Sequence, residues 1–379
     1  MRVYLDHNAS APLREEAREA MREALDLVGN PSSAHREGAR ARSVVERARA
    51  DVAVLIGAAP AEIVFTSGAT EANNLALRGV LGARPGALVT TTIEHASVRE
   101  TAQALAQGGT AVVTVGVDHI GRLGASDVAA ACPPATALVS VALANGEVGS
   151  TAPLAEIAAA LAGRGVLVHT DAAQAVGRIP VDVGRLGVDL LSVSGHKLGG
   201  PTGIGALWIR RGVALQPALT GGPQERDRRA GTENVVGIAG FGAAASSARA
   251  ELTAAMAHVA ALRDRLWHGI RAALPDAVPN GPIDEPRLPN TLNVTIPGVA
   301  GESLLVLLDL AGIAASLGSA CAAGAPEPSH VLRAMGRSEA DARGGLRLSL
   351  GATTTTVDVD RVVETLPRVV AQIRAGKAA

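Results

Sequence analysis

Aromatic residues are scarce in this chain of 379 residues, which contains two Trp, one Tyr and two Phe. Its hydrophobic core must therefore be built from aliphatic side chains, and a planar ligand has few phenyl rings on which to stack. Cysteine is almost absent too, since only Cys132 and Cys321 occur, far apart in the chain. Two separated cysteines, behind an N-terminus without the apolar core of a signal peptide, indicate a cytoplasmic protein with reduced thiols.

Long apolar runs and an excess of one charge are also missing. Polar residues interrupt each apolar run well before the roughly 20 residues that cross a bilayer, so no membrane span is expected. The 35 Lys and Arg residues are balanced by 36 Asp and Glu, which argues against a nucleic acid partner. Arginines 36, 40, 47 and 49 of one expected helix alternate with acidic residues, a pattern typical of a solvated helix face.

The sequence does contain a regular alternation of strand and helix patterns. Its length predicts two or three folding units. Strand and helix patterns alternate over 62–209, which predicts an α/β fold with a mostly parallel seven-stranded sheet covered by helices on both faces. A long helix is expected over about 235–274, and the proline-rich texture beyond it indicates a smaller α+β domain. The predicted units are an N-terminal segment 1–13 that joins the small domain, a large domain 14–258 and a small domain 259–379.

Two neighbouring strand patterns end in residues of opposite charge. The pattern 165–171 ends at Asp171, and the next one leads into the segment 194–197, which ends at Lys197. Ligands of α/β sheets lie beyond the carboxyl ends of the strands, so these two side chains are expected to face one cleft. A lysine that forms a Schiff base and an acid that keeps a pyridinium nitrogen protonated are what pyridoxal 5′-phosphate requires. Taken alone, a lysine in this position is more often a solvated cap.

A turn of small residues follows the strand pattern 62–66. The residues Ser67-Gly-Ala-Thr70 lead directly into a helical pattern. Unpaired backbone N–H groups at the positive end of a helix dipole suit a phosphate group. The alternative is an ordinary helix start that a Ser or Thr side chain caps.

In this order, the residues resemble the pyridoxal-phosphate-dependent cysteine desulfurases, a group within the class V aminotransferases that has the aspartate-aminotransferase fold. The resemblance covers essentially the whole chain. It is carried by DHNAS (6–10), TSGATE (66–71), EH (94–95), DAAQ (171–174), SGHK (194–197), RAGTEN (229–234), GSAC (318–321) and LRLSLG (346–351). The GSAC segment is similar to the group that supplies sulfur for iron–sulfur clusters and tRNA thiolation.

The resemblance implies a role for each matching residue. Lys197 would hold the cofactor and move protons at the substrate Cα, and Asp171 would stabilise protonation of the ring nitrogen. Gln174 would bind the ring hydroxyl, and His95 would stack on the ring and serve as acid or base. For His95, the alternative is a histidine that caps the helix beginning at Ala96.

Further matching positions are implied for the phosphate and for the substrate. The phosphate would be bound by Ala69, Thr70, Ser194, His196 and, from a second subunit, Thr232. The substrate would be bound by Asn8, Ala9 and Arg347. The contribution from a second subunit predicts a homodimer. Arg347 would clamp the substrate carboxylate, since no acid is adjacent to pair with it as a structural residue.

Cys321 carries the specific activity that the resemblance implies. It lies among glycines and alanines, which are too small to bury a structural cysteine well, whereas a loop able to swing suits a thiolate that meets first a substrate and then an acceptor. This thiolate would attack the sulfur of L-cysteine, leaving L-alanine and an enzyme persulfide, and an acceptor or scaffold protein would receive the sulfur. Cys132 has no such setting and is expected to be structural.

Two departures from the family pattern stand out. The family usually has Asn-Asn-Glu where this chain has Asn145-Gly146-Glu147, so either Asn145 shifts toward the cofactor or one polar contact is missing. Pro223 and Asp227 stand where the family tends to have glycine, and they are expected to stiffen that loop.

Two other functions fit the same motifs. One is a lyase or aminotransferase of the same fold, such as a selenocysteine lyase, in which Cys321 is not a nucleophile. The other is a cofactor-bound sulfur-relay or scaffold subunit that turns over slowly by itself.

Overall fold

The computed structural model describes residues 2–284, 286–317 and 328–376. Its largest sheet has seven strands in the order β2-β8-β7-β6-β5-β3-β4, and only β8 runs antiparallel to its neighbours. The strands are β2 (Ile63–Thr66), β3 (Ala87–Thr91), β4 (Val112–Val115), β5 (Thr136–Ser140), β6 (Leu167–Asp171), β7 (Leu190–Ser194) and β8 (Gly205–Ile209). The predicted mostly parallel seven-stranded sheet is confirmed.

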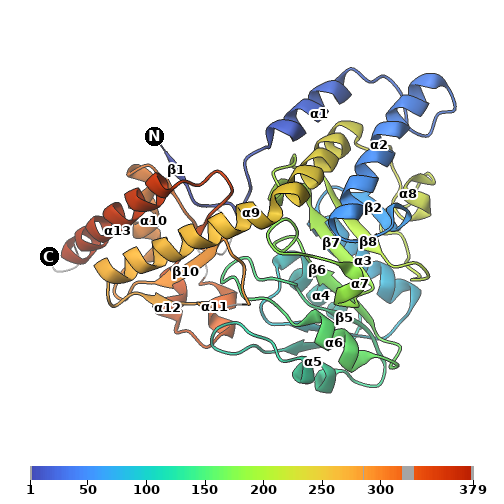
Figure 1. The fold of residues 1–379 in the computed structure, drawn as a ribbon. Helices are drawn as coiled ribbons and strands as arrows, with labels where there is room; N and C mark the ends of the chain where they lie inside the picture. The colour runs from blue at the N-terminus through green and yellow to red at the C-terminus, as the bar shows by residue number, and fades with distance from the viewer. Residues whose placement is uncertain (1, 285, 318–327, 377–379) are drawn as a thin grey trace.

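Helices cover both faces of this sheet, as Figure 1 shows. Alternate residues of a strand point to opposite faces, so Val64 and Leu88 pack with α3 on one face, whereas Ile63 and Val89 belong to the cluster on the other face, which includes residues of α2 and α9. Burial on both sides explains why the strand patterns are nearly continuous apolar runs. The helices of this part are α1 (Glu15–Leu25), α2 (Arg36–Leu55), α3 (Ala69–Ala83), α4 (Ala96–Gln107), α5 (Ala125–Ala131), α6 (Leu154–Leu161), α7 (Val183–Leu186) and α8 (Gln224–Asp227), with short 3-10 turns η1 (Pro60–Glu62) and η2 (Gly195–Lys197).

A second, smaller core surrounds an antiparallel sheet of order β12-β10-β9. Its elements are β9 (Val278–Pro279), β10 (Thr291–Thr295), α10 (Gly301–Leu310), β11 (Ile313–Ala314), α11 (His330–Ala334), α12 (Glu339–Arg343), β12 (Gly345–Ser349) and α13 (Thr356–Gly376). The N-terminal strand β1 (Val3–Tyr4) pairs in parallel with β11, and Val3 and Leu5 are buried in this same core. The domain limits at 13 and 258 stay predictions.

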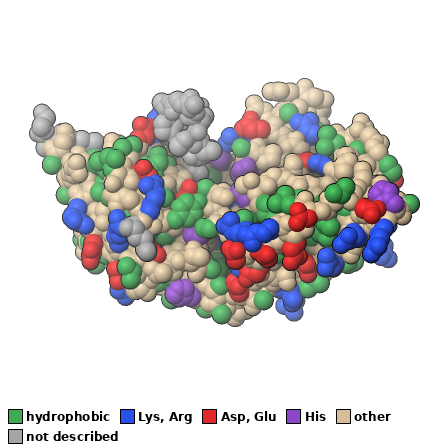
Figure 2. Space-filling model, turned by 90° about the horizontal axis from the view of Figure 1, so that it is seen from above, with side chains coloured by type: hydrophobic (Ala, Val, Ile, Leu, Met, Phe, Trp, Pro, Cys, Tyr) green, Lys and Arg blue, Asp and Glu red, His purple; other side chains and the backbone are tan. Residues whose placement is uncertain are grey.

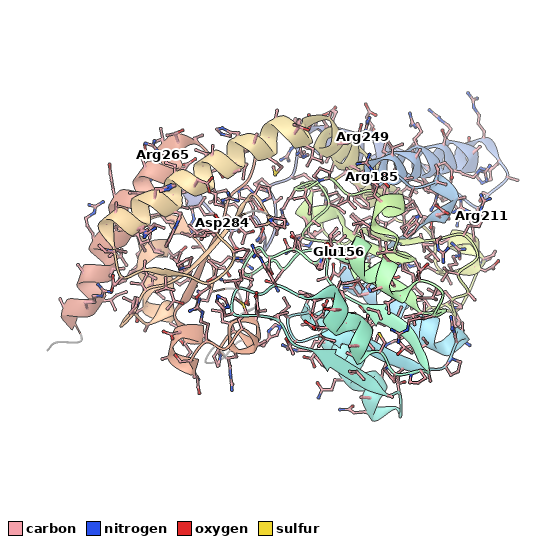
Figure 3. The ribbon with its side chains drawn as sticks, turned by 60° about the horizontal axis from the view of Figure 1, so that its bottom comes forward. Glu156, Arg185, Arg211, Arg249, Arg265 and Asp284 are labelled. Atoms are coloured by element: carbon pink, nitrogen blue, oxygen red, sulfur yellow. The ribbon has the colours of Figure 1, made fainter. Side chains whose placement is uncertain are left out.

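One long helix, α9 (Val235–Ala273), extends from the first core to the second (Figure 1). Ile238 and Phe241 are buried in the core beside the large sheet, and Leu262 and Leu266 in the smaller core. Arg249 and Arg265 lie at separate parts of this helix (Figure 3), and Arg265 forms an ion pair of 2.7 Å with Asp360 of α13. The helix predicted over about 235–274 is confirmed.

The prediction that the arginines of α2 form a solvated face is wrong for Arg49. Only 3% of Arg49 is exposed, and its guanidinium makes two bonds to the Glu225 carboxylate, of 2.7 and 2.9 Å. Tertiary packing places this position of α2 against the 222–227 loop, which sequence spacing does not reveal. Glu225, Arg226 and Asp227 all have left-handed backbone angles, with φ of 47, 58 and 62°. The buried ion pair therefore anchors a strained loop that also contains the unusual Pro223.

Charges of both signs lie close together on the face shown in Figure 2. This agrees with the near balance of acidic and basic residues in the sequence. Within the described ranges, no helix combines the length and the apolar character needed to cross a membrane.

Candidate active site

Adjacent strand ends bring Asp171 and Lys197 into one region. Strands β6 and β7 pair in parallel, with Asp171 opposite Ser192. Beyond the end of β7, the turn η2 carries Lys197. Both groups thus lie at the carboxyl edge of the sheet, where ligands of α/β proteins bind.

The amine of Lys197 donates hydrogen bonds only to backbone carbonyls among the described residues. Its acceptors are the carbonyl oxygens of Asn8 and of Ala9, the latter at 2.9 Å. The pKa of Lys197 is lowered to about 7, first by burial and then by the positive charges of Arg178 and Arg347, while Asp171 and Asp6 oppose the shift. A large fraction of this amine is therefore uncharged and nucleophilic near neutral pH.

Arg178 is a buried cation that the sequence analysis missed. Its guanidinium donates to the carbonyl oxygens of Gln174, at 2.9 Å, and of His7, at 3.0 Å, and also to the side-chain oxygen of Gln174. Burial lowers the pKa of Arg178 to about 9, and Arg347 contributes to this shift. The Gln174 amide in turn donates to the Asn8 carbonyl at 3.0 Å. Arg178 and Gln174 thus hold the N-terminal segment whose carbonyls face Lys197. The sequence did contain a signal for this contact. Arg178 follows Gln174 by four residues, which is the spacing at which side chains of a helix contact each other.

Asp171 is fixed by two donors. Its carboxylate accepts from the backbone N–H of Ala173 at 2.9 Å and from the side-chain amide of Asn73 at 2.7 Å. Asn73, on α3, is completely buried and was also missed. A pair of asparagines, Asn73 and Asn74, inside an otherwise apolar helix was the signal that could have indicated it.

His95 caps helix α4, as the alternative given for this residue predicted. Its Nδ1 accepts from the backbone N–H of Ser97 at 3.1 Å. The residue is exposed, so its ring remains accessible. The stacking and acid–base roles stay predictions.

The candidate phosphate residues lie at three places. Ala69 and Thr70 form the first turn of α3, whose N-cap is Gly68, and none of the described side chains caps this helix end. The alternative of an ordinary Ser or Thr cap is therefore wrong, and the N–H groups of the turn remain available to an anion. Ser194 is buried at the end of β7. The pKa of His196 is lowered to about 4 by burial and then by Lys197 and Arg178, so this ring is neutral at pH 7. The remaining candidate, Thr232, is exposed just before α9.

The substrate candidates at the N-terminal side are already engaged. The Asn8 side chain points inward, where its amide donates to Thr291 and to the Gly146 carbonyl, both at 2.8 Å, and its oxygen accepts from Asn290 at 2.9 Å. In this segment, the backbone carbonyls of Asn8 and Ala9, and not the Asn8 side chain, accept from Lys197.

The expectation that Arg347 has no acid to pair with is wrong. Its guanidinium donates to Asp6 at 2.8 Å and to the Gly146 carbonyl at 3.3 Å. Asp6 lies 341 positions away in the sequence, and the parallel bridge between Asp6 and Ser349 brings the two side chains together. Arg347 is thus preoriented by an acid that is itself partly exposed, at 22%.

Asn145 does not replace the missing asparagine at Gly146. Its amide group donates to the Ile93 carbonyl at 3.0 Å and accepts from the N–H groups of Glu147 and Val148 at 2.8 and 3.0 Å. An added Cβ at Gly146 would lie 2.7 Å from the Gln174 amide nitrogen. The absence of a side chain at Gly146 therefore leaves space for the Gln174 side chain.

A family model described as aminotransferase class-V matches residues 3–362. The chain belongs to the class-V aminotransferase family. A cysteine desulfurase of Cereibacter sphaeroides is 47% identical over 99% of this chain and 97% of that protein. A solved NifS-like protein is 37% identical, with a TM-score of 0.92 over 98% of this chain and 100% of the other. A structure of SspA in complex with cysteine is 34% identical, with a TM-score of 0.82 over 93% of this chain and 100% of the other.

Two buried carboxyl groups of this class-V aminotransferase lie near the site without contacting Lys197. Burial raises the pKa of Glu94 to about 7 and that of Glu147 to about 6. The Ser329 hydroxyl donates to Glu147 at 2.5 Å, and the ring of His330 contacts the Glu94 carbonyl at 3.0 Å. The Glu147 carboxyl group and the Glu94 backbone thus hold the start of α11 against the large sheet, while the Glu94 carboxyl group accepts from Thr91 and from the Ala142 N–H.

Of the two cysteines of this class-V aminotransferase, the structure describes Cys132. Cys132 is buried, and its thiol donates to the Val128 carbonyl at 3.2 Å, which agrees with a structural residue. Burial raises the pKa of the Cys132 thiol, so it is a poor nucleophile. Cys321 lies outside the described residues.

Proposed function

We propose that this protein is a pyridoxal-phosphate-dependent cysteine desulfurase that converts L-cysteine to L-alanine and transfers the sulfur to Cys321. The observation that carries the proposal is the meeting of an amine of lowered pKa, Lys197, with a fixed carboxylate, Asp171, at adjacent strand ends. The proteins that resemble this chain along nearly its whole length include cysteine desulfurases. Binding of cysteine by SspA supports cysteine as the substrate.

The donor set of the site fits pyridoxal 5′-phosphate. Among the described residues, Lys197 forms no ion pair with an acid, and Asp171 accepts from two donors, Asn73 and the backbone N–H of Ala173. The free N–H groups at the start of α3 suit the phosphate, together with Ser194 and His196. Gln174 would bind the ring hydroxyl, and Thr232 would complete the phosphate site from a second subunit of a homodimer. When bound, the cofactor supplies an aldehyde that condenses with amines and a ring that withdraws electrons from the substrate Cα.

The protein groups then position the substrate and move its protons. Lys197, once free, takes the proton from Cα and later returns a proton to the product, which its lowered pKa allows near neutral pH. Arg347 holds the substrate carboxylate in a bidentate pair, for which it exchanges its contact with Asp6. His95 covers the reacting groups from the start of α4.

The sulfur transfer balances without an added oxidant. The thiolate of Cys321 attacks the substrate sulfur, a new S–S bond forms, and the bond between that sulfur and the substrate Cβ breaks. The sulfur is oxidised to the persulfide level, while Cβ is reduced and gains a proton to become the methyl group of alanine. An acceptor protein then receives the outer sulfur, and proteins that assemble iron–sulfur clusters or thiolate tRNA are the class we propose.

The test follows products and protein together. The purified protein is incubated with L-cysteine, alanine and sulfide are measured with a reductant present, and the intact mass is measured without one. We expect alanine formation and one added sulfur atom, which peptide mapping places on Cys321.

Substitutions separate this proposal from its alternatives. Cys321→Ala should abolish the added sulfur, whereas Cys132→Ala, at the structural cysteine, should leave it unchanged. Alanine and sulfide formation by Cys321→Ala at the original rate would contradict the proposal and favour a lyase of the selenocysteine lyase type. Negligible turnover of the unaltered protein with every acceptor would favour the scaffold alternative.

A further inference from the structure

A continuous line of hydrogen bonds connects Asp171 to His95 through two side chains that have no assigned role. The amide nitrogen of Asn73 lies 2.7 Å from Oδ2 of Asp171 and 2.8 Å from Oγ of Ser97. Oγ of Ser97 lies 2.8 Å from Nδ1 of His95. The line crosses three elements, β6, α3 and α4. It therefore connects the acid at the sheet edge to the exposed ring at the start of α4.

The direction of each bond follows from the chemistry of Asp171. An ionised carboxylate only accepts hydrogen bonds, so the Asn73 amide must present its nitrogen to Asp171. This orientation leaves the side-chain oxygen of Asn73 buried without a partner among the described residues. A buried polar atom without a partner is costly, so the contact with Asp171 must decide which way the amide faces.

The remaining hydrogens are then assigned by elimination. The second N–H of the Asn73 amide donates to the hydroxyl oxygen of Ser97. The backbone N–H of Ser97 can only donate, and it lies 3.1 Å from Nδ1 of His95, so Nδ1 is an acceptor. The Ser97 hydroxyl therefore turns its own hydrogen toward the same Nδ1. A nitrogen that accepts from two donors carries no hydrogen. The neutral His95 ring must therefore carry its proton on Nε2.

We propose that Asn73 and Ser97 are positioning residues that connect Asp171 to His95 and hold the His95 ring as the Nε2–H tautomer. In that form the ring offers a hydrogen-bond donor at Nε2, which has no partner among the described residues. It does not offer a free base there. The tautomer follows from the geometry alone, whereas its use in catalysis rests on the function proposed above.

A purely structural link between α3 and α4 is the competing explanation, and the chain contains a matched example of one. The Thr101 hydroxyl on α4 contacts the Asn74 side chain of α3 at 2.9 Å, and Thr101 is buried like Ser97. This second link lies about one helical turn after Ser97 along α4. Thr101→Val thus removes a bond between the same helices, together with the bond that this hydroxyl donates to the backbone carbonyl of Ser97 at 2.8 Å. It leaves in place the side-chain bonds of Asn73 and Ser97 that form the line to His95.

The test reads the His95 ring directly by ¹⁵N NMR of the holoprotein with ¹⁵N-labelled histidine, assigned with His95→Gln. We expect a neutral ring with its proton on Nε2 and with Nδ1 shifted as in a hydrogen-bond acceptor. In Ser97→Ala, the Nδ1 signal should move toward the position of a nitrogen with one donor fewer, and in Thr101→Val it should stay in place. A proton on Nδ1 in the unaltered protein, or an Nδ1 signal that Ser97→Ala does not move, would overturn the proposal.

Kinetics supply a second readout. Ser97→Ala should lower kcat for alanine formation by roughly three- to tenfold, the loss expected for one ordinary hydrogen bond, with KM for cysteine little changed. Equal losses in Ser97→Ala and Thr101→Val would instead indicate the structural link. If the unaltered protein forms no alanine from cysteine, the proposed function fails while the NMR result still decides the tautomer.

Discussion

The sheet side of the site and its N-terminal side are built in different ways. At the sheet edge, Asp171 and Lys197 are placed by the register of two parallel strands. At the N-terminal side, segment 6–9 is held by side chains far away in sequence, through the pairs Asp6–Arg347 and Asn8–Thr291. The sheet side therefore positions chemical groups by backbone pairing, whereas the N-terminal side depends on individual polar contacts.

The two sides also differ in what they offer to Lys197. The sheet side supplies a carboxylate, which favours the charged amine, and the N-terminal side supplies carbonyl acceptors together with the cations Arg178 and Arg347. Burial and the two cations prevail, since the pKa of Lys197 falls to about 7. We infer that the amine belongs to the sheet side, while its protonation state is set first by burial and then by the two cations.

The largest effect is expected from removing the reactive group of the sheet side. Lys197→Ala should lower alanine formation from cysteine by roughly 10²- to 10⁴-fold, the contribution typical of positioned proton transfer. The chain contains only one other lysine, Lys377, and Lys377→Ala should keep full activity. Borohydride should attach the cofactor at position 197 of the unaltered protein, as peptide mass analysis would reveal. Attachment at 377 would refute the assignment.

The next largest effect concerns the cation that connects the two sides. Arg178→Met removes one positive charge near Lys197, so we expect the Lys197 pKa to rise from about 7 by roughly one unit, with burial and Arg347 still lowering it. Because the proposed mechanism uses Lys197 as the uncharged amine, the acidic limb of the pH–rate profile should move upward by the same amount. NMR of the isotopically methylated amine in the apoprotein measures the titration directly.

A control variant and the pH dependence of stability belong to the same prediction. Arg178→Lys keeps the charge and should leave the titration near its original position. In the unaltered protein, the unfolded chain binds more protons at Lys197 than the folded chain between about pH 7 and the usual lysine pKa, so this group makes stability rise with pH in that window. A Lys197 titration unmoved in Arg178→Met would contradict a contribution of Arg178 to the lowered pKa.

A smaller effect is expected at the N-terminal side. Asp6→Asn weakens the ion pair with Arg347. Since the proposed mechanism has Arg347 exchange this pair for the substrate carboxylate, KM for cysteine should fall by about threefold while the free energy of unfolding drops by about 1 kcal/mol. Steady-state kinetics and urea unfolding measure the two changes. A higher KM with unchanged stability would mean that Asp6 helps to bind the substrate and does not compete with it.

The smallest effect is expected at Gly146. In Gly146→Ala the new methyl group would meet the Gln174 amide at 2.7 Å, so Gln174 must turn from the Asn8 carbonyl. We expect a loss of about 1 kcal/mol in stability and a roughly twofold faster release of cofactor. Gly116→Ala is the control, because an added Cβ there meets nothing within 4 Å. Equal behaviour of the two variants would show that Gln174 adapts freely.

Much of the sheet side could be predicted because its signals are local. Apolar strand patterns, each followed by a short polar segment, predict where Asp171 and Lys197 lie, since parallel strands end at one edge of a sheet. The buried position of Arg49 could not be predicted in this way. Its spacing fits an exposed helix face, and only the packing of the 222–227 loop against α2 buries it beside Glu225.

The sequence by itself determined the fold class, the placement of Asp171 and Lys197 at strand ends and a helix start beside the turn 67–70, because each depends on residues close together in the chain. Only the tertiary structure decided that Asp6 pairs with Arg347, that the charge of Arg178 lowers the pKa of Lys197 and that Asn73 and Ser97 connect Asp171 to His95. These contacts join segments brought together by sheet register and helix packing. Hydrogen bonds act over about 3 Å, so sequence spacing carries no record of which distant polar groups will meet.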